Sequence, residues 1–145
     1  MAETAGYRSP LRPDANAGRV ALVTGGGTGI GRATARELAA SGARVAVCGR
    51  REEPLERVRE EIEAGGGECL AVAADLREPA EVARAVGAAL ERFGKLDVLV
   101  NNAGGQFSAP AEPEALLAAV SAALDDFADG AGFDDRAMLA LQRTA

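Results

Sequence analysis

The chain has 145 residues, 48% of them hydrophobic, and a formal net charge of −6. This length suits one domain with a single core, and an aromatic content of only 3% means that the core is aliphatic. The acidic balance argues against general affinity for nucleic acid. No apolar run approaches the roughly 20 residues of a membrane span, and the N-terminal MAETAGYRSPLRP has no hydrophobic signal core. We therefore expect a soluble protein of the cytoplasm, without nucleic-acid or membrane partners.

Four short apolar runs alternate with three segments rich in helix-forming residues. The runs predict strands at residues 20–24, 44–48, 69–73 and 96–100. Helices are expected at residues 32–40, from Pro54 to the glycines at 65–67, and from Pro79 onward, with each proline at a first helical position. Strands that are apolar throughout and alternate with helices predict a parallel sheet covered on both faces.

The two cysteines, Cys48 and Cys69, lie in these apolar runs, which favours reduced thiols in the core. The sequence has no CxxC pair and no histidine. A zinc site is therefore not expected, and we assign no metal ligand.

A glycine-rich turn, TGGGTGIG at residues 24–31, joins the first strand to the first helix. Gly25 permits the tight turn, Gly29 lets the backbone approach a pyrophosphate, and Gly31 lets the helix pack close to the sheet. The helix N-terminus offers free N–H groups and a positive dipole end to an anion. The segment predicts a phosphate-binding turn, and the alternative is a glycine turn without a ligand.

Three motifs together resemble the short-chain dehydrogenase/reductase family over residues 19–107. TGGGTGIG resembles its TGxxxGxG fingerprint, Asp75-Leu76 resembles its adenine-contacting acidic pair, and NNAG at 101–104 resembles its third marker. The resemblance implies a Rossmann-like, doubly wound α/β sheet of strand order 3-2-1-4 and an oxidoreductase that uses a nicotinamide dinucleotide. The segments YRSPLRP before the domain and NNAGGQF at its end most resemble the sequences of the branch that contains enoyl-CoA and dienoyl-CoA reductases and terpenoid-alcohol dehydrogenases.

The resemblance also implies a set of cofactor contacts along these motifs. The set comprises Thr24, Gly25, Thr28, Gly29, Ile30, Gly31, Asp75, Leu76, Asn101, Asn102, Ala103 and Gly104. Asp75 could instead be only a turn residue. Asn101 and Asn102 could serve mainly to tie strands together, a role that coexists with cofactor contact in this family.

The residues after the second strand bear on the choice of cofactor. NAD binding favours an acidic side chain there, which accepts a hydrogen bond from the ribose 2′-OH. This chain has Gly49-Arg50-Arg51 instead, and a guanidinium group can bind a 2′-phosphate through two hydrogen bonds. The sequence therefore predicts NADP rather than NAD, with Arg50 favoured over Arg51 because it lies nearer the strand end. The alternative is that both arginines are solvated residues at a helix start.

The family's catalytic set is expected to be missing from these 145 residues. Its hydride transfer uses a Tyr-x-x-x-Lys pair and a serine downstream of NNAG. The only tyrosine is Tyr7 and the only lysine is Lys95, and Ser108 and Ser121 follow NNAG too closely. We therefore assign no catalytic residue, and we expect a truncated chain that is inactive alone and lacks the family's usual oligomer interface.

The last quarter of the chain has a different composition. Residues 109–145 hold 2 basic and 7 acidic residues, against 14 and 15 in residues 1–108. We expect a flexible N-terminal arm at 1–18, an NADP-binding half-domain at 19–107 and an acidic tail at 108–145. Within the tail we expect a helix at 113–128 and a strand at 137–141, and this strand could join the sheet as its fifth.

Residues 113–145 resemble the C-terminal end of PPM-type serine/threonine phosphatases. Asp134-Asp135 would match a metal-ligating pair of that family. Such sites need further oxygen ligands from distant segments, so here the pair is expected to be solvated.

Three hypotheses about function remain open at this stage. The first is the nucleotide-binding portion of an NADP-dependent oxidoreductase, inactive alone. The second is a regulatory or interaction protein that uses its tail, and the third is a half-enzyme completed by a second chain. A bound dinucleotide would favour the first, and cofactor-independent capture of a partner would favour the second.

Overall fold

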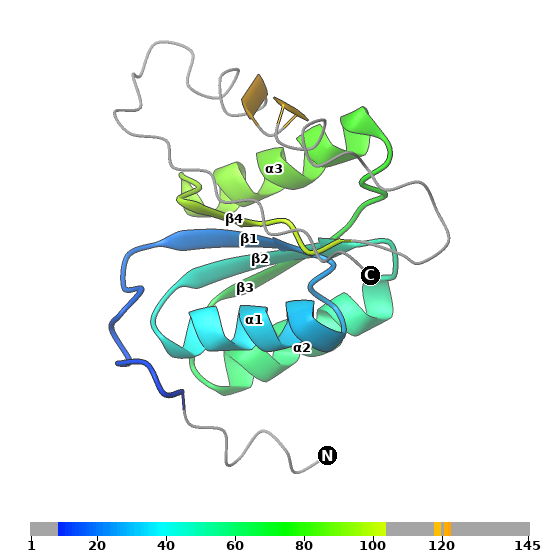
Figure 1. Ribbon diagram of the computed structural model, residues 1–145. Coiled ribbons are helices and arrows are strands. Elements are labelled where there is room, and N and C mark those ends of the chain that lie inside the picture. Colours follow the sequence, from blue (N-terminus) through cyan, green and yellow to red (C-terminus); the bar gives the residue numbers. More distant parts are fainter. Residues whose placement is uncertain (1–8, 104–117, 120, 123–145) are drawn as a thin grey trace.

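The computed structural model describes residues 9–103, 118–119 and 121–122 (Figure 1). Its elements alternate in the order β1 (Val20–Thr24), α1 (Gly29–Ala40), β2 (Arg44–Gly49), α2 (Glu52–Ala64), β3 (Cys69–Ala73), α3 (Pro79–Phe93) and β4 (Val98–Val100). The strands form one parallel sheet of order β3-β2-β1-β4, which confirms the predicted Rossmann-like architecture. Helices α1 and α2 cover one face of the sheet and α3 covers the other (Figure 1).

The central strand β1 is almost entirely apolar because both faces of the sheet are covered there. All five residues of β1 are buried, because this strand lies between β2 and β4. On the α3 face, Leu22 packs in one core cluster with Val86 and Leu90. On the α1 and α2 face, Val23 packs in a second cluster with Val58. Successive β1 residues therefore supply the two cores alternately, as the pleat of a strand requires.

Two helix starts differ from those predicted from the sequence. Helix α1 begins at Gly29 and not at residue 32, so the second half of the glycine turn is itself the first helical turn. Helix α2 begins at Glu52, which corrects the prediction that Pro54 takes the first position. A proline is tolerated at this third position because N–H groups of the first turn have no partner within the helix.

Strand β4 is shorter than the predicted run at 96–100. The carboxylate of Asp97 accepts a hydrogen bond from the backbone N–H of Val20 (Oδ2 to N, 2.8 Å). The backbone N–H of Asp97 in turn donates to the Val20 carbonyl at 2.9 Å. Regular pairing with β1 therefore begins only at Val98, which lies opposite Ala21.

The described part of the N-terminal segment contacts the turn after α1. Asn16 donates from its backbone N–H to the carbonyl of Ser41 and from its side-chain Nδ2 to the Ser41 Oγ, both at 2.8 Å. Ser41 is fully buried there. No helix among the described residues is long and apolar enough to cross a membrane.

The predicted tail helix falls mostly outside the described residues. Residues 118–119 and 121–122 are helical, and Ala119 is partly buried against the core cluster beneath α3. The rest of that helix, the predicted strand at 137–141 and the Asp134-Asp135 pair lie outside the described part of the chain.

Candidate cofactor-binding site

The glycine turn lies at the carboxyl end of β1 and is anchored to the neighbouring strand. The N–H groups of Gly25 and Gly26 both point to the carbonyl of Cys48 in β2, at 2.8 and 3.3 Å. Gly25 has φ +62 and Gly29 has φ +56, a conformation that other L-residues rarely adopt. The turn therefore requires glycine at both positions for conformational reasons.

Gly31 meets the predicted requirement for close packing. A Cβ atom on this residue would lie 2.1 Å from the carbonyl oxygen of Gly25 and 2.6 Å from Nδ2 of Asn102. A Cβ on Gly29, in contrast, would meet no atom within 4 Å. The backbone at Gly29 consequently faces open space, as it must if an anion is to approach the helix N-terminus.

Thr28 and Ile30 flank Gly29 at the start of α1. Thr28 occupies the N-cap position, but its side chain makes no capping hydrogen bond to the helix. Ile30 is 58% exposed and is one of two large apolar residues among the described ones that are exposed. Both side chains are thus placed on the open side of the turn, where a ligand could contact them.

The residues after β4 are tied to the end of β1 by side-chain hydrogen bonds. The hydroxyl oxygen of Thr24 accepts from the N–H groups of Asn102 and Ala103, both at 2.9 Å. The Asn102 side-chain amide donates to the carbonyls of Thr24 (3.2 Å) and Gly25 (3.3 Å). Asn101 is buried, and its Oδ1 lies 3.4 Å from the Thr24 hydroxyl. The strand-tying role considered for the asparagines is therefore present.

The last residue of the NNAG motif, Gly104, lies outside the described residues. The predicted cofactor contacts of Asn101, Asn102 and Ala103 stay predictions, because the bonds above concern only the protein.

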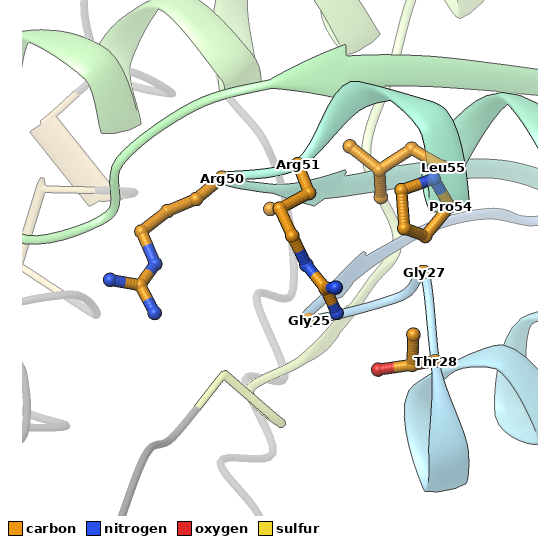
Figure 2. Close-up of a pocket in the computed structure, with 8 residues that line it drawn as sticks. Gly25, Gly27, Thr28, Arg50, Arg51, Pro54 and Leu55 are labelled. Carbon is orange, nitrogen blue, oxygen red and sulfur yellow. The ribbon is translucent and has the colours of Figure 1, made fainter. Parts of the chain in front are cut away.

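A cavity of about 380 Å³ opens beside the glycine turn (Figure 2). It is lined by Gly25, Gly27, Thr28, Gly49, Arg50, Arg51, Pro54 and Leu55. The structure therefore brings together four residues predicted from separate motifs, two from the turn and the two arginines. The other four are not among the cofactor contacts predicted from the sequence, although Pro54 is predicted at the start of the second helix.

The two arginines differ in direction. Figure 2 shows the Arg51 side chain extending over the cavity toward Gly25 and Thr28, whereas the Arg50 side chain is directed away from them. Arg50 is close enough to Asp75 for its charge to help lower the pKa of that carboxyl group. Neither arginine forms an ion pair with a carboxylate in the described part of the chain.

Asp75 and Leu76 follow β3 at the same edge of the sheet. The N–H of Ala74 donates to the carbonyl of Gly49 (2.8 Å), which holds Asp75 next to the arginine end of β2. The Asp75 carboxylate accepts hydrogen bonds from the side chain and backbone of Arg77, and these lower the pKa of Asp75 to about 2. Leu76 packs partly buried against the core cluster under α3.

The two cysteine side chains are buried in the core and do not line the cavity. Burial raises the pKa of both Cys48 and Cys69 to about 12, and both are free thiols. Within residues 9–103 and the four helical residues beyond, no group of three or more His, Cys, Asp or Glu side chains is placed to hold a metal ion.

A parallel sheet of this order, with a glycine turn and a helix N-terminus at its carboxyl edge, defines a Rossmann-type nucleotide-binding domain. The chain belongs to the short-chain dehydrogenase family, since the model of that family, described as short chain dehydrogenase, matches residues 19–123. The match extends beyond residue 107, the predicted end of the family-like part. The resemblance of residues 113–145 to phosphatases stays a prediction.

The relatives support the family and part of the expected branch. The peroxisomal 2,4-dienoyl-CoA reductase of Arabidopsis thaliana is 40% identical over 104 residues, which are 72% of this chain and 35% of that protein. The chain thus spans about a third of the length of this curated relative. Because this relative is named as peroxisomal, the expected cytoplasmic location stays a prediction.

Solved structures of similar fold come from several bacteria. The citronellol catabolism dehydrogenase AtuB of Pseudomonas aeruginosa has a TM-score of 0.68 and 38% identity, and the alignment covers 83% of this chain and 54% of that one. A short chain dehydrogenase of Burkholderia cenocepacia, in complex with NADP, has a TM-score of 0.64 and 37% identity over 76% of this chain and 51% of its own.

A third neighbour carries the other dinucleotide. The 3-ketoacyl-(acyl-carrier-protein) reductase of Brucella melitensis, complexed with NADH, has a TM-score of 0.63 and 37% identity over 78% of this chain and 51% of its own. Family membership therefore implies a nicotinamide dinucleotide, and the choice between NADP and NAD depends on this chain's own residues.

Proposed function

We propose that residues 19–103 bind NADP(H) in preference to NAD(H) as the cofactor-binding part of a short-chain dehydrogenase/reductase. The observation that carries this proposal is the cavity beside the glycine turn, which is lined by both Arg50 and Arg51, and neither arginine forms an ion pair with a carboxylate of the described chain. Two guanidinium groups at the end of β2, neither of them in an ion pair within the described chain, suit a 2′-phosphate. A carboxylate, which would accept from a free 2′-OH, is absent from this cavity lining.

The residues present fit the parts of the dinucleotide. The open backbone at Gly29 and the free N–H groups at the start of α1 would hold the pyrophosphate. Thr28 and the two arginines would hold the 2′-phosphate of the adenosine ribose, and Asp75 would meet the adenine. When bound, the nicotinamide would supply the hydride chemistry, while the described residues bind and orient the cofactor.

The sequence favours Arg50 for the 2′-phosphate, whereas the geometry supports a larger role for Arg51. Arg51 extends over the cavity toward the turn, and Arg50 extends away from it and acts electrostatically on Asp75 (Figure 2). We therefore assign the main phosphate contact to Arg51 and a contact nearer the adenine to Arg50.

Substitution of single arginines tests the assignment. Arg51→Ala should weaken NADPH binding by about 10- to 150-fold, the equivalent of about 1.5–3 kcal/mol for lost charge-assisted hydrogen bonds, and should change NADH binding little. Arg57→Ala is the matched control, because Arg57 is an exposed arginine on the same helix that pairs with Glu53. Fluorescence titration of the reduced nucleotides measures both. Equal losses for NADPH and NADH in Arg51→Ala would contradict the assignment.

We further propose that residues 1–145 alone bind the dinucleotide without turning it over. The sequence contains no Tyr-x-x-x-Lys pair, and general acid–base groups typically contribute about 10²–10⁴-fold to rate. The catalytic groups would then come from a further segment or a second chain. NADPH oxidation by the purified 145-residue chain, lost on substitution of a residue within it, would contradict this proposal.

A further inference from the structure

The loop between β3 and α3 fixes one carboxylate unusually well for an exposed turn. The backbone N–H of Glu78 donates to the Asp75 carbonyl at 3.0 Å and closes a turn over residues 75–78. Within the turn, the backbone N–H of Arg77 donates to Oδ1 of Asp75 at 3.1 Å. This hydrogen bond from a backbone N–H to the side chain two residues before it is an Asx turn. It fixes the position of Oδ1.

The Arg77 side chain holds the second oxygen as well. Its Nε donates to Oδ1 at 2.9 Å and lies 3.1 Å from Oδ2, while its terminal nitrogen donates to Oδ2. Among residues 9–103, the guanidinium of Arg77 hydrogen-bonds only to Asp75. The Arg77 side chain is 53% exposed and Asp75 is 30% exposed, so the pair adds little to packing and its main effect is to orient the carboxylate.

Asp75 does not line the cavity, but its carboxylate lies near the residues at the Arg50 end of it. Ala74 bonds to Gly49, which lines the cavity, and Arg50 lies near enough to act on Asp75 electrostatically. An ionised carboxylate offers about four acceptor positions and no donor. Arg77 leaves some of these free, so Asp75 can still accept from a ligand. The site would therefore attract an amino group and repel a carbonyl oxygen.

We propose that Arg77 is a positioning residue that fixes Asp75 as the acceptor for the 6-amino group of adenine, so that the site selects adenine over a 6-oxo purine. The proposal rests on the proposed dinucleotide function and extends it from the phosphate to the base. An aspartate is ionised at physiological pH even at its ordinary pKa of 3.8, and the Arg77 hydrogen bonds lower the pKa of Asp75 further, to about 2, so Asp75 acts there only as an acceptor.

The test compares NADPH with deamino-NADPH, in which hypoxanthine replaces adenine. The purified chain should bind NADPH about tenfold or more tightly than the deamino analogue, as expected for one charge-assisted hydrogen bond. Arg77→Ala should reduce this ratio to about threefold or less, and Arg77→Lys should restore it only in part, because an ammonium cannot hold both oxygens in a fixed plane. Arg57→Ala should leave the ratio unchanged.

A double-mutant cycle separates positioning from general damage. In an Asp75→Asn background, which removes the charged acceptor, Arg77→Ala should change the ratio no further. The melting temperature of Arg77→Ala should stay close to that of the unaltered chain, because the pair is exposed. Full retention of the ratio in Arg77→Ala, or an equal loss in both backgrounds, would overturn the proposal.

Two further outcomes are informative. If the unaltered chain binds NADPH but does not discriminate against the deamino analogue, the inference about Asp75 and Arg77 fails while the proposed function stands. If the chain binds neither nucleotide, the proposed function fails and the inference fails with it.

Discussion

Replacement of Gly31 by alanine should strongly destabilise the fold. The added Cβ would lie 2.1 Å from the Gly25 carbonyl oxygen and 2.6 Å from Nδ2 of Asn102. A carbon rarely approaches an oxygen more closely than about 3.3 Å, so α1 and the turn must separate by about 1 Å. The carbonyl is backbone and cannot swing aside. Overpacking of this kind costs about 1–3 kcal/mol, occasionally more, and we expect the upper end of that range.

Two other glycines supply matched comparisons. Gly87, inside α3, has no atom within 4 Å of an added Cβ, so Gly87→Ala should stabilise the chain by about 0.5–1 kcal/mol through helix propensity. An added Cβ on Gly29 would likewise meet no atom within 4 Å, but Gly29 has φ +56. Gly29→Ala should therefore lower the free energy of unfolding by about 1–2 kcal/mol through backbone strain. From most to least stable, the expected order is therefore Gly87→Ala, the unaltered chain, Gly29→Ala and Gly31→Ala.

Thermal unfolding followed by circular dichroism measures this order. At about 3–4 °C per kcal/mol for a chain of this size, Gly31→Ala should lower Tm by about 10 °C and Gly87→Ala should raise it by about 2–4 °C. NADPH affinity should fall in Gly31→Ala and not in Gly87→Ala, because only the former displaces the helix N-terminus. A Gly31→Ala variant as stable as Gly87→Ala would refute the close packing of the turn against α1.

Burial raises the pKa of Cys48 to about 12, so iodoacetamide at pH 8 should label it only after unfolding; labelling of the native chain at the rate of a free thiol would contradict this burial. Asp75 should titrate near pH 2 by carbon NMR, and near its ordinary value of 3.8 in Arg77→Ala. Because its folded pKa is the lower one, the small stability that this exposed pair contributes is present above about pH 4 and is lost as the pH falls toward 2; an unshifted titration would show that the Arg77 contacts do not persist in solution. Ala119 packs against the core under α3, so deletion of residues 113–145 should lower Tm and solubility, and an unchanged Tm would make this segment an appendage.

The sheet was predictable because its signals are local. Strands β1 and β2 are short runs that are buried almost throughout, and buried parallel strands need no polar alternation. The strand order came from the resemblance carried by the glycine turn and the NNAG motif. The start of α1 was less accessible to sequence reasoning, because Gly29 and Gly31 are poor helix formers and are placed there by packing against the turn.

The cavity lining was only half predictable. Gly25, Thr28 and the arginines stand out by type, whereas Pro54 and Leu55 line the cavity because α2 starts beside the turn, a tertiary arrangement that no local pattern encodes. The directions of Arg50 and Arg51 likewise depend on the backbone between β2 and α2. Arg77 could have been found: an arginine two residues after an aspartate in a turn is a recognisable pairing.

The proposed recognition of a 2′-phosphate by the cavity beside the glycine turn can be measured without the nicotinamide. Calorimetry of the purified chain compares adenosine 2′,5′-bisphosphate with adenosine 5′-phosphate, which differ only in the 2′-phosphate. The 2′-phosphate should tighten binding by about tenfold or more at low salt, and Arg51→Ala should remove most of this gain. Equal affinity for the two ligands, with Arg50 and Arg51 intact, would show that the cavity does not recognise the 2′-phosphate.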